Sequence, residues 1–132
     1  KIELIVRGMC CLMPGKPGLS ENITVISIIG RFLEHSRIFW FANDGKPEAY
    51  IGSADWMRRN LDRRVEAITP IESPALRNQL EELLEIYLQD NIEAWEMQSD
   101  GGFIKRQPKG QQNCAQSRLI DEWHKALQMA ES

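Results

Sequence analysis

Runs of β-branched and aromatic residues recur along this chain, and each is closed by glycine, proline or a polar cluster. Such runs favour β-strands. In the first run, Ile2, Leu4 and Val6 alternate on one face and Ile5 adds apolar character to the other, which suits a strand covered on both sides. We expect strands at 1–7, 23–29, 37–42, 49–52, 65–71, 92–97 and 103–107.

Segments with helical spacing lie between these strands. Ser73 and Pro74 predict the start of a helix, as N-cap and first helical residue, and apolar residues recur at helical spacing as far as Leu88. Shorter helical segments are predicted at 30–35 and 56–64, and Ser53 or Asp55 should cap the second. Because strands alternate with helices, the sequence predicts an α/β fold with a mixed sheet flanked by helices.

Turns and the last segment complete this outline. Asp44 and Gly45 accept the positive φ of a tight turn and predict a hairpin between 37–42 and 49–52. The stretch 8–22 is rich in proline and glycine and is predicted to be a long loop. The helix predicted at 114–129 carries an apolar stripe, including Trp123 and Leu127, that should dock on the body of the domain.

Length and composition limit the classes of function. The 132 residues predict one domain over 1–132. The formal net charge of −3 argues against a broad nucleic-acid surface, so any anion site must be local. No apolar run approaches the ~20 residues that cross a bilayer. Three cysteines, with Cys10 and Cys11 adjacent, suggest neither a disulfide framework nor a common metal motif. We expect a cytoplasmic protein. Because the chain starts without methionine and enters a strand at once, we expect a piece of a larger polypeptide.

His35 is the leading candidate for chemistry. It precedes the strand predicted at 37–42, and Arg37 lies two residues on, on the same side of an extended chain. An imidazole can act as nucleophile, acid or base toward phosphorus when cations offset the phosphate charge. Arg37 and Arg7, which ends the first predicted strand, could supply such cations, because guanidinium groups form paired hydrogen bonds with phosphate oxygens. His124 is predicted to be an ordinary residue of the last helix.

A second concentration of charge lies at 55–64. It consists of Arg58, Arg59, Arg63 and Arg64, mixed with Asp55 and Asp62. One interpretation is a solvated helix face with ion pairs between residues four apart. The other is an anion pocket at the helix N-terminus, lined by Ser53, Asn60 and some of these arginines. Cys10 and Cys11 could approach such a pocket, although buried packing is the simpler expectation. Phosphate loops, dinucleotide motifs, cysteine and histidine metal clusters and serine hydrolase elbows are missing from the sequence.

Three segments can be read together: IVRGMCCL at 5–12, ISIIGRFLEHSRIF at 26–39 and GSADWMRRNLDRRVE at 52–66. In this order they resemble the C-terminal domain of the bacterial polyphosphate kinase family whose catalytic core is similar to phospholipase D. The resemblance extends from Lys1 to about Trp123. It implies a phospholipase D-like fold and an enzyme that reversibly transfers the terminal phosphate of ATP to polyphosphate through a phosphohistidine.

The resemblance also implies roles for single residues. His35, in EHSR, matches the second active-site histidine of the family, and Arg7, in IVRG, matches an arginine that contacts the nucleotide phosphates. The pattern His35–Arg37 with Ser53 and Asn60 is similar to the H-x-K, Ser and Asn pattern of phospholipase D relatives, with arginine in place of lysine. The phosphorylated histidine and the magnesium ligands are implied to lie outside this chain, so we expect no metal site built from this chain alone.

The implied partners are ATP or ADP, inorganic polyphosphate and the other domains of the same polypeptide, with no nucleic acid. The complete protein is implied to be a homo-oligomer, and the isolated domain is expected to be inactive. Two other functions stay open at this point. One is a phosphodiesterase of the phospholipase D superfamily, and the other is a non-catalytic module that binds polyanions.

Overall fold

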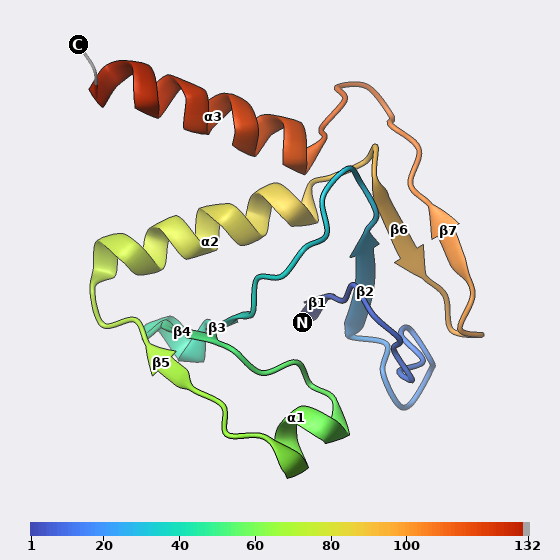
Figure 1. Cartoon of the computed structure of the whole chain (residues 1–132). Coiled ribbons are helices and arrows are strands. Elements are labelled where there is room, and N and C mark those ends of the chain that lie inside the picture. Colours follow the sequence, from blue (N-terminus) through green and yellow to red (C-terminus); the bar gives the residue numbers. More distant parts are fainter. Residues whose placement is uncertain (131–132) are drawn as a thin grey trace. The chain divides into compact units, whose positions relative to one another are not determined.

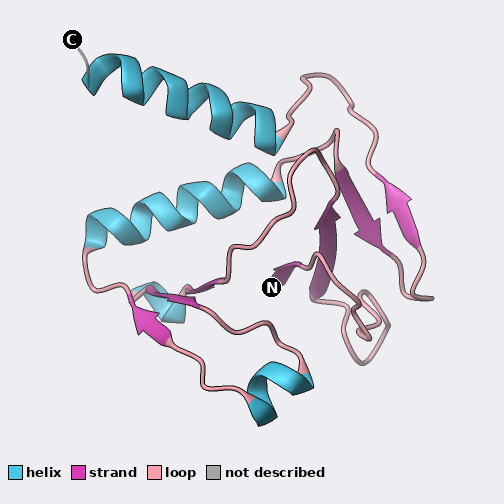
Figure 2. Cartoon of the chain, in the orientation of Figure 1, coloured by secondary structure: helices cyan, strands magenta, loops and turns pink. Residues whose placement is uncertain are grey.

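The structure, a computed structural model, describes residues 1–130 (Figures 1 and 2). Its elements in chain order are β1 (Ile2–Ile5), β2 (Ile23–Ile28), β3 (Ile38–Phe41), the 3-10 turn η1 (Asn43–Gly45), β4 (Glu48–Gly52), α1 (Arg58–Arg63), β5 (Ile68–Pro70), α2 (Pro74–Leu88), β6 (Ala94–Met97), β7 (Phe103–Lys105) and α3 (Ala115–Ala130). The α/β class is confirmed, and α2 starts at the predicted proline.

The chain divides into two compact units. Unit 2 is His35–Glu85, and unit 1 consists of the segments on either side of it. The helix α2 begins in unit 2 and its last turn belongs to unit 1. The expectation that 1–132 acts as a single domain stays a prediction.

Unit 1 contains a mixed sheet with the strand order β1-β2-β6-β7. β2 is parallel to β1 and antiparallel to β6. Its residues from Val25 to Ile28 are all buried, because a strand with neighbours on both edges and cover on both faces has no side chain left in water. The β-branched run of β2 therefore forms the core of unit 1.

Unit 2 contains a separate antiparallel sheet with the order β3-β4-β5. β3 pairs with β4 along its whole length, so the predicted hairpin is confirmed. In the connection, Asn43, Asp44 and Gly45 all have positive φ, a conformation that glycine adopts freely and that asparagine and aspartate tolerate. The runs of β-forming residues predict these strands, but the division into two sheets was not predicted.

Residues 30–35 do not form the predicted helical turns and instead bend between β2 and β3. The side-chain amide of Gln116 accepts a hydrogen bond from Phe32 N at 3.0 Å and donates one to Phe32 O at 2.8 Å. These two bonds satisfy backbone groups that a helix would pair internally. The local prediction was wrong because the deciding partner lies far away in the sequence.

The predicted caps of the helix at 56–64 were also wrong. α1 starts at Arg58, and Met57 occupies the N-cap position without a side-chain hydrogen bond. Ser53 donates instead to Glu66, and Asp55 accepts from Arg37. Both candidate caps are therefore committed to contacts within the sheet and loops of unit 2.

The last helix, α3, is covered over only part of its length. Leu119 and Ile120 are half-buried, whereas Trp123 is 66% exposed and Leu127 is exposed as well. The prediction that the whole apolar stripe docks on the domain is wrong for the second half of the helix within residues 1–130. None of the helices among these residues has the length and apolar character that crossing a bilayer requires.

Candidate functional site

The predicted pair His35 and Arg37 lies at the start of unit 2, directly before β3. Arg37 Nε and Nη2 lie 3.0 and 2.8 Å from Asp55 Oδ1, and Arg37 Nη1 donates to the backbone oxygen of His35 at 2.6 Å. The guanidinium has about five N–H groups, so roughly two of them are left for an anion. The side chain of Arg37 is 27% exposed and that of His35 is exposed, so a ligand can reach both.

Glu66 is a member of this site that the sequence analysis missed. Its Oε2 accepts a hydrogen bond from Ser53 Oγ, and its Oε1 accepts one from Asn60 Nδ2 at 2.8 Å. The bond from Ser53 lowers the pKa of the Glu66 carboxyl most, the bond from Asn60 lowers it further, and nearby arginines including Arg37 act in the same direction. Glu66 therefore provides a stable negative charge beside the predicted serine and asparagine.

The polar side chains of this site are held by buried or shared contacts. Asn60 is only 3% exposed, and its Oδ1 is buried with no hydrogen-bond partner within residues 1–130. Ser53 Oγ accepts the N–H of Ala67 at 3.1 Å while it donates to Glu66. The predicted grouping of Ser53 with Asn60 is thus present, and the carboxylate that joins them stands at the end of the segment GSADWMRRNLDRRVE.

We expect the Glu66 carboxyl to titrate below the ordinary value of a glutamate, about 4.3. Because its folded pKa is depressed, its contribution to stability is present above the unfolded pKa and is lost as the pH falls through the folded pKa. Ser53→Ala should raise the midpoint, measured by carbon NMR of the carboxyl. Ser36→Ala, the same change at an exposed serine, should leave it in place. A midpoint that Ser53→Ala does not move would contradict this assignment.

The segment that leads to His35 is fixed within unit 1. Glu34 accepts hydrogen bonds from Tyr87 Oη and from Gln116 Nε2, both at 2.7 Å. Burial raises the pKa of the Tyr87 hydroxyl above its ordinary value, and the Glu34 carboxylate raises it further. Tyr87 therefore stays protonated and acts as a donor, which anchors the residue next to His35.

Arg7 follows β1 in unit 1 and is exposed. The N–H of Val6 donates to Ile26 O at 2.8 Å, so the backbone is tied to β2 one residue before Arg7. Because the backbone is already fixed here, binding of an anion by this long side chain would cost little additional conformational entropy of the backbone. That Arg7 and His35 bind the same phosphate stays a prediction.

The structure gives no special site for the remaining candidates, which are the arginines at 58–64, the cysteines at 10–11 and His124. Arg58 Nε lies 3.1 Å from Asp62 Oδ2, which supports the interpretation of a solvated helix face with ion pairs. All four arginines of this segment are exposed. Cys10 is half-buried and Cys11 is exposed, so the expectation of buried packing was wrong for Cys11. His124 is exposed on α3.

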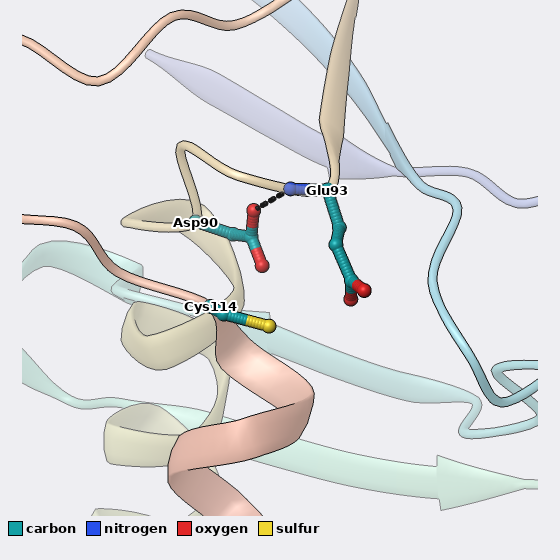
Figure 3. Close-up of side chains that lie close together, drawn as sticks. All are labelled: Asp90, Glu93 and Cys114. Atoms are coloured by element: carbon teal, nitrogen blue, oxygen red, sulfur yellow. Dashed lines mark hydrogen bonds between the residues drawn. The ribbon is translucent and has the colours of Figure 1, made fainter.

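One cluster within residues 1–130 combines several possible metal ligands: Asp90, Glu93 and Cys114, whose ligand atoms lie within 4.8 Å of one another (Figure 3). Asp90 is fully buried, and its carboxylate already accepts four backbone N–H groups. They belong to Ile92, Glu93, Ala94 and Ala115. Such donors satisfy a buried carboxylate without a cation, and a thiol is a poor ligand for magnesium. The cluster does not fit magnesium, and Asp90 acts as a structural residue.

Comparison with known sequences relates the chain to polyphosphate kinases. The family described as "Polyphosphate kinase C-terminal domain 2" matches residues 1–117. The chain is 66% identical over 132 residues to polyphosphate kinase from Prochlorococcus marinus (strain MIT 9313), an alignment that covers 98% of this chain and 18% of the relative. It is 70% identical over 107 residues to polyphosphate kinase from Thermosynechococcus vestitus, covering 81% of this chain and 15% of the relative.

Comparison with solved structures agrees with this result. The crystal structure of polyphosphate kinase from Porphyromonas gingivalis matches with a TM-score of 0.90 and 41% sequence identity. The match covers 98% of this chain and 20% of that protein. The chain thus spans about a fifth of the length of the relatives that it matches.

Proposed function

The chain belongs to the polyphosphate kinase family, as its C-terminal domain 2, and we propose that it supplies phosphate-binding residues to an ATP:polyphosphate phosphotransferase. The observation that carries the proposal is the exposed His35 with Arg37 beside it, in a unit whose Ser53, Asn60 and Glu66 form one hydrogen-bonded group. An enzyme of this kind moves the terminal phosphate of ATP to a polyphosphate chain and back, through a phosphohistidine outside this chain.

Each residue has a role that its chemistry allows. His35 acts as acid, base or hydrogen-bond donor to the phosphoryl oxygens while the group moves, and its exposure leaves it accessible. Arg7 and Arg37 offset the charge of the phosphate oxygens, which suits the loose transition state of phosphoryl transfer. Asp55 fixes the plane of the Arg37 guanidinium through the contacts at 3.0 and 2.8 Å.

The proposal extends to properties that the family resemblance implies. They are a phospholipase D-like fold, a cytoplasmic location where ATP is available, other domains of the same polypeptide as partners, and a homo-oligomeric complete protein. Magnesium would be bound by residues outside this chain, because Asp90, Glu93 and Cys114 do not suit it.

We expect Arg7→Ala in the complete protein to lower kcat/KM for ATP by about 10-fold to 100-fold, the cost of one charge-assisted contact to phosphate. The measurement is ATP-dependent growth of polyphosphate. Arg58→Ala removes an exposed arginine that is paired with Asp62 and should leave the rate unchanged.

The same assay tests the proposed function. A complete protein that hydrolyses a generic phosphodiester and does not lengthen polyphosphate would be a phosphodiesterase. A protein that binds polyphosphate and transfers no phosphate from ATP would be a polyanion-binding module. Equal kcat/KM in the Arg7→Ala variant and the unchanged protein would remove Arg7 from the phosphate site.

A further inference from the structure

Trp56 is 76% exposed on the loop between β4 and α1. Its ring nevertheless has a defined partner. It stacks on the ring of Phe39 in β3, with 5.7 Å between the ring centroids and 20° between the ring planes. Tryptophan is highly buried on average in folded proteins. An indole that is 76% exposed while one face stacks on Phe39 leaves its other face open to a ligand.

The Phe39 ring beneath Trp56 is held by the sheet of unit 2. Phe39 lies opposite Tyr50 in β4 and is half-buried. A Cβ added to Gly52 of β4 would lie 3.7 Å from Phe39 Cε2, so the Phe39 ring packs against the backbone of Gly52. The stack of Phe39 and Trp56 is therefore an aromatic surface formed in advance, and a ligand that binds it loses little affinity to ordering the protein.

This stack lies beside Arg37. Arg37 and Phe39 are two residues apart where β3 begins, and side chains at that spacing point to the same face of a strand, about 7 Å apart. The residues that contact them are consecutive as well, because Asp55 binds Arg37 and Trp56 stacks on Phe39. Two adjacent loop residues thus hold a guanidinium group and an aromatic surface side by side on one face of the sheet.

We propose that the open face of Trp56 stacks on the base of the nucleotide whose phosphates bind at His35 and Arg37. This inference rests on the proposed function and deepens it by assigning the part of the site that binds the nucleobase. Bases stack on exposed aromatic side chains through their π-faces. One sugar separates the base of a nucleotide from its nearest phosphate, which suits an aromatic surface next to a phosphate-binding arginine.

Such a surface has a specific use in this reaction. ATP and polyphosphate both present a chain of phosphate groups, and a guanidinium group binds the phosphate oxygens of either one. The base is the part of ATP that polyphosphate lacks. Trp56 thus adds affinity for ATP and ADP and none for polyphosphate. Because every base has a π-face, the contact favours nucleotides over polyphosphate and does not select one base over another.

Steady-state kinetics of the complete protein test the inference through two constants, the KM for ATP in synthesis and the KM for polyphosphate in the reverse reaction. Trp56→Ala should raise the KM for ATP by about 5-fold to 100-fold, the cost of one lost base stack, and leave the KM for polyphosphate unchanged. Trp56→Phe keeps an aromatic ring and should retain most of the affinity for ATP. Trp123→Ala, the same change at an exposed tryptophan of α3, is the matched control and should change neither constant.

Two results would overturn the proposal. One is an unchanged KM for ATP in the Trp56→Ala variant. The other is an equal rise in both constants, which would mean that Trp56 contacts another part of the polypeptide and not the base. Calorimetry with ATP on the same variants separates this inference from the proposed function. A protein that transfers no phosphate, but loses affinity for ATP on Trp56→Ala, would keep the stacking site and fail only as a phosphotransferase.

Discussion

Replacing His35 with alanine in the complete protein should lower the rate of polyphosphate synthesis by about 10²-fold to 10⁴-fold, the usual contribution of a positioned acid or base. An imidazole can act as a proton donor and as a proton acceptor, whereas the arginines of the site act as donors alone. Arg7 and Arg37 would remain to offset the charge of the phosphate. We therefore expect a loss in kcat that is larger than the change in KM.

The His35→Ala variant should change catalysis without changing the fold. His35 is exposed, and Arg37 Nη1 binds the backbone oxygen of residue 35 and not its ring. Removal of the ring leaves the contact between Arg37 and Asp55 intact, so stability should change by no more than about 0.5 kcal/mol. His124→Ala removes the other histidine, which is exposed on α3, and should leave synthesis unchanged. Normal synthesis by the His35→Ala variant would refute the role of His35.

The strands were predictable because their signal is local. The run at 23–29 is β-branched and apolar throughout, and the structure buries Val25 to Ile28 in the centre of a sheet. The hairpin was predictable for the same reason, since Asp44 and Gly45 supply positive φ at the turn itself. Which sheet a strand joins depends on partners far along the chain. Spacing carries no signal for that choice.

The errors have a common physical cause. Gln116 binds both backbone groups of Phe32, and this contact replaces the helix that the composition of 30–35 favours. Ser53 is a good capping residue, yet its hydroxyl binds Glu66 and the N–H of Ala67. In both cases a distant polar partner satisfied a group that local propensity assigned to a helix. The helix propensity of a short segment is small in free energy, and a hydrogen bond to a distant side chain can outweigh it.

The candidate site shows the same division. His35 and Arg37 were predictable because they lie two residues apart and their chemistry suits phosphate. Glu66 was not predictable as a member of the site, because a glutamate close in sequence to four arginines suggests a surface ion pair. Its hydrogen bonds to Ser53 and Asn60, rather than its charge alone, identify it as a member of the site. The family resemblance identified residues that lie within its motifs and have an implied role, such as His35 and Arg7. It did not identify Glu66.

Replacing Asp90 with alanine should destabilise unit 1 by about 3–5 kcal/mol, the largest effect on stability that we expect from one substitution. Oδ1 accepts the N–H groups of Ile92, Glu93 and Ala94 at 3.0, 2.7 and 3.0 Å, and Oδ2 accepts that of Ala115 at 2.7 Å. Alanine would leave these donors without an acceptor at a site with no exposure. It would also remove the contact at the first residue of α3.

Hydrogen exchange measures this effect locally, because it reports on the opening of single amides. In the Asp90→Ala variant, the amides at the start of α3 and of β6 should exchange roughly 10²-fold faster or more. Asp90→Asn should have a smaller effect, because its oxygen can still accept from one side while its amide group opposes the remaining N–H donors. Asp100→Ala is the matched control, since Asp100 Oδ1 accepts a single N–H from Gly102 at 2.8 Å in an exposed turn. It should cost about 0.5 kcal/mol. Equal exchange in the Asp90→Ala and Asp100→Ala variants would mean that the buried carboxylate does not hold α3 to the sheet, because Asp90 accepts a hydrogen bond from the first residue of that helix and Asp100 accepts one from its own turn.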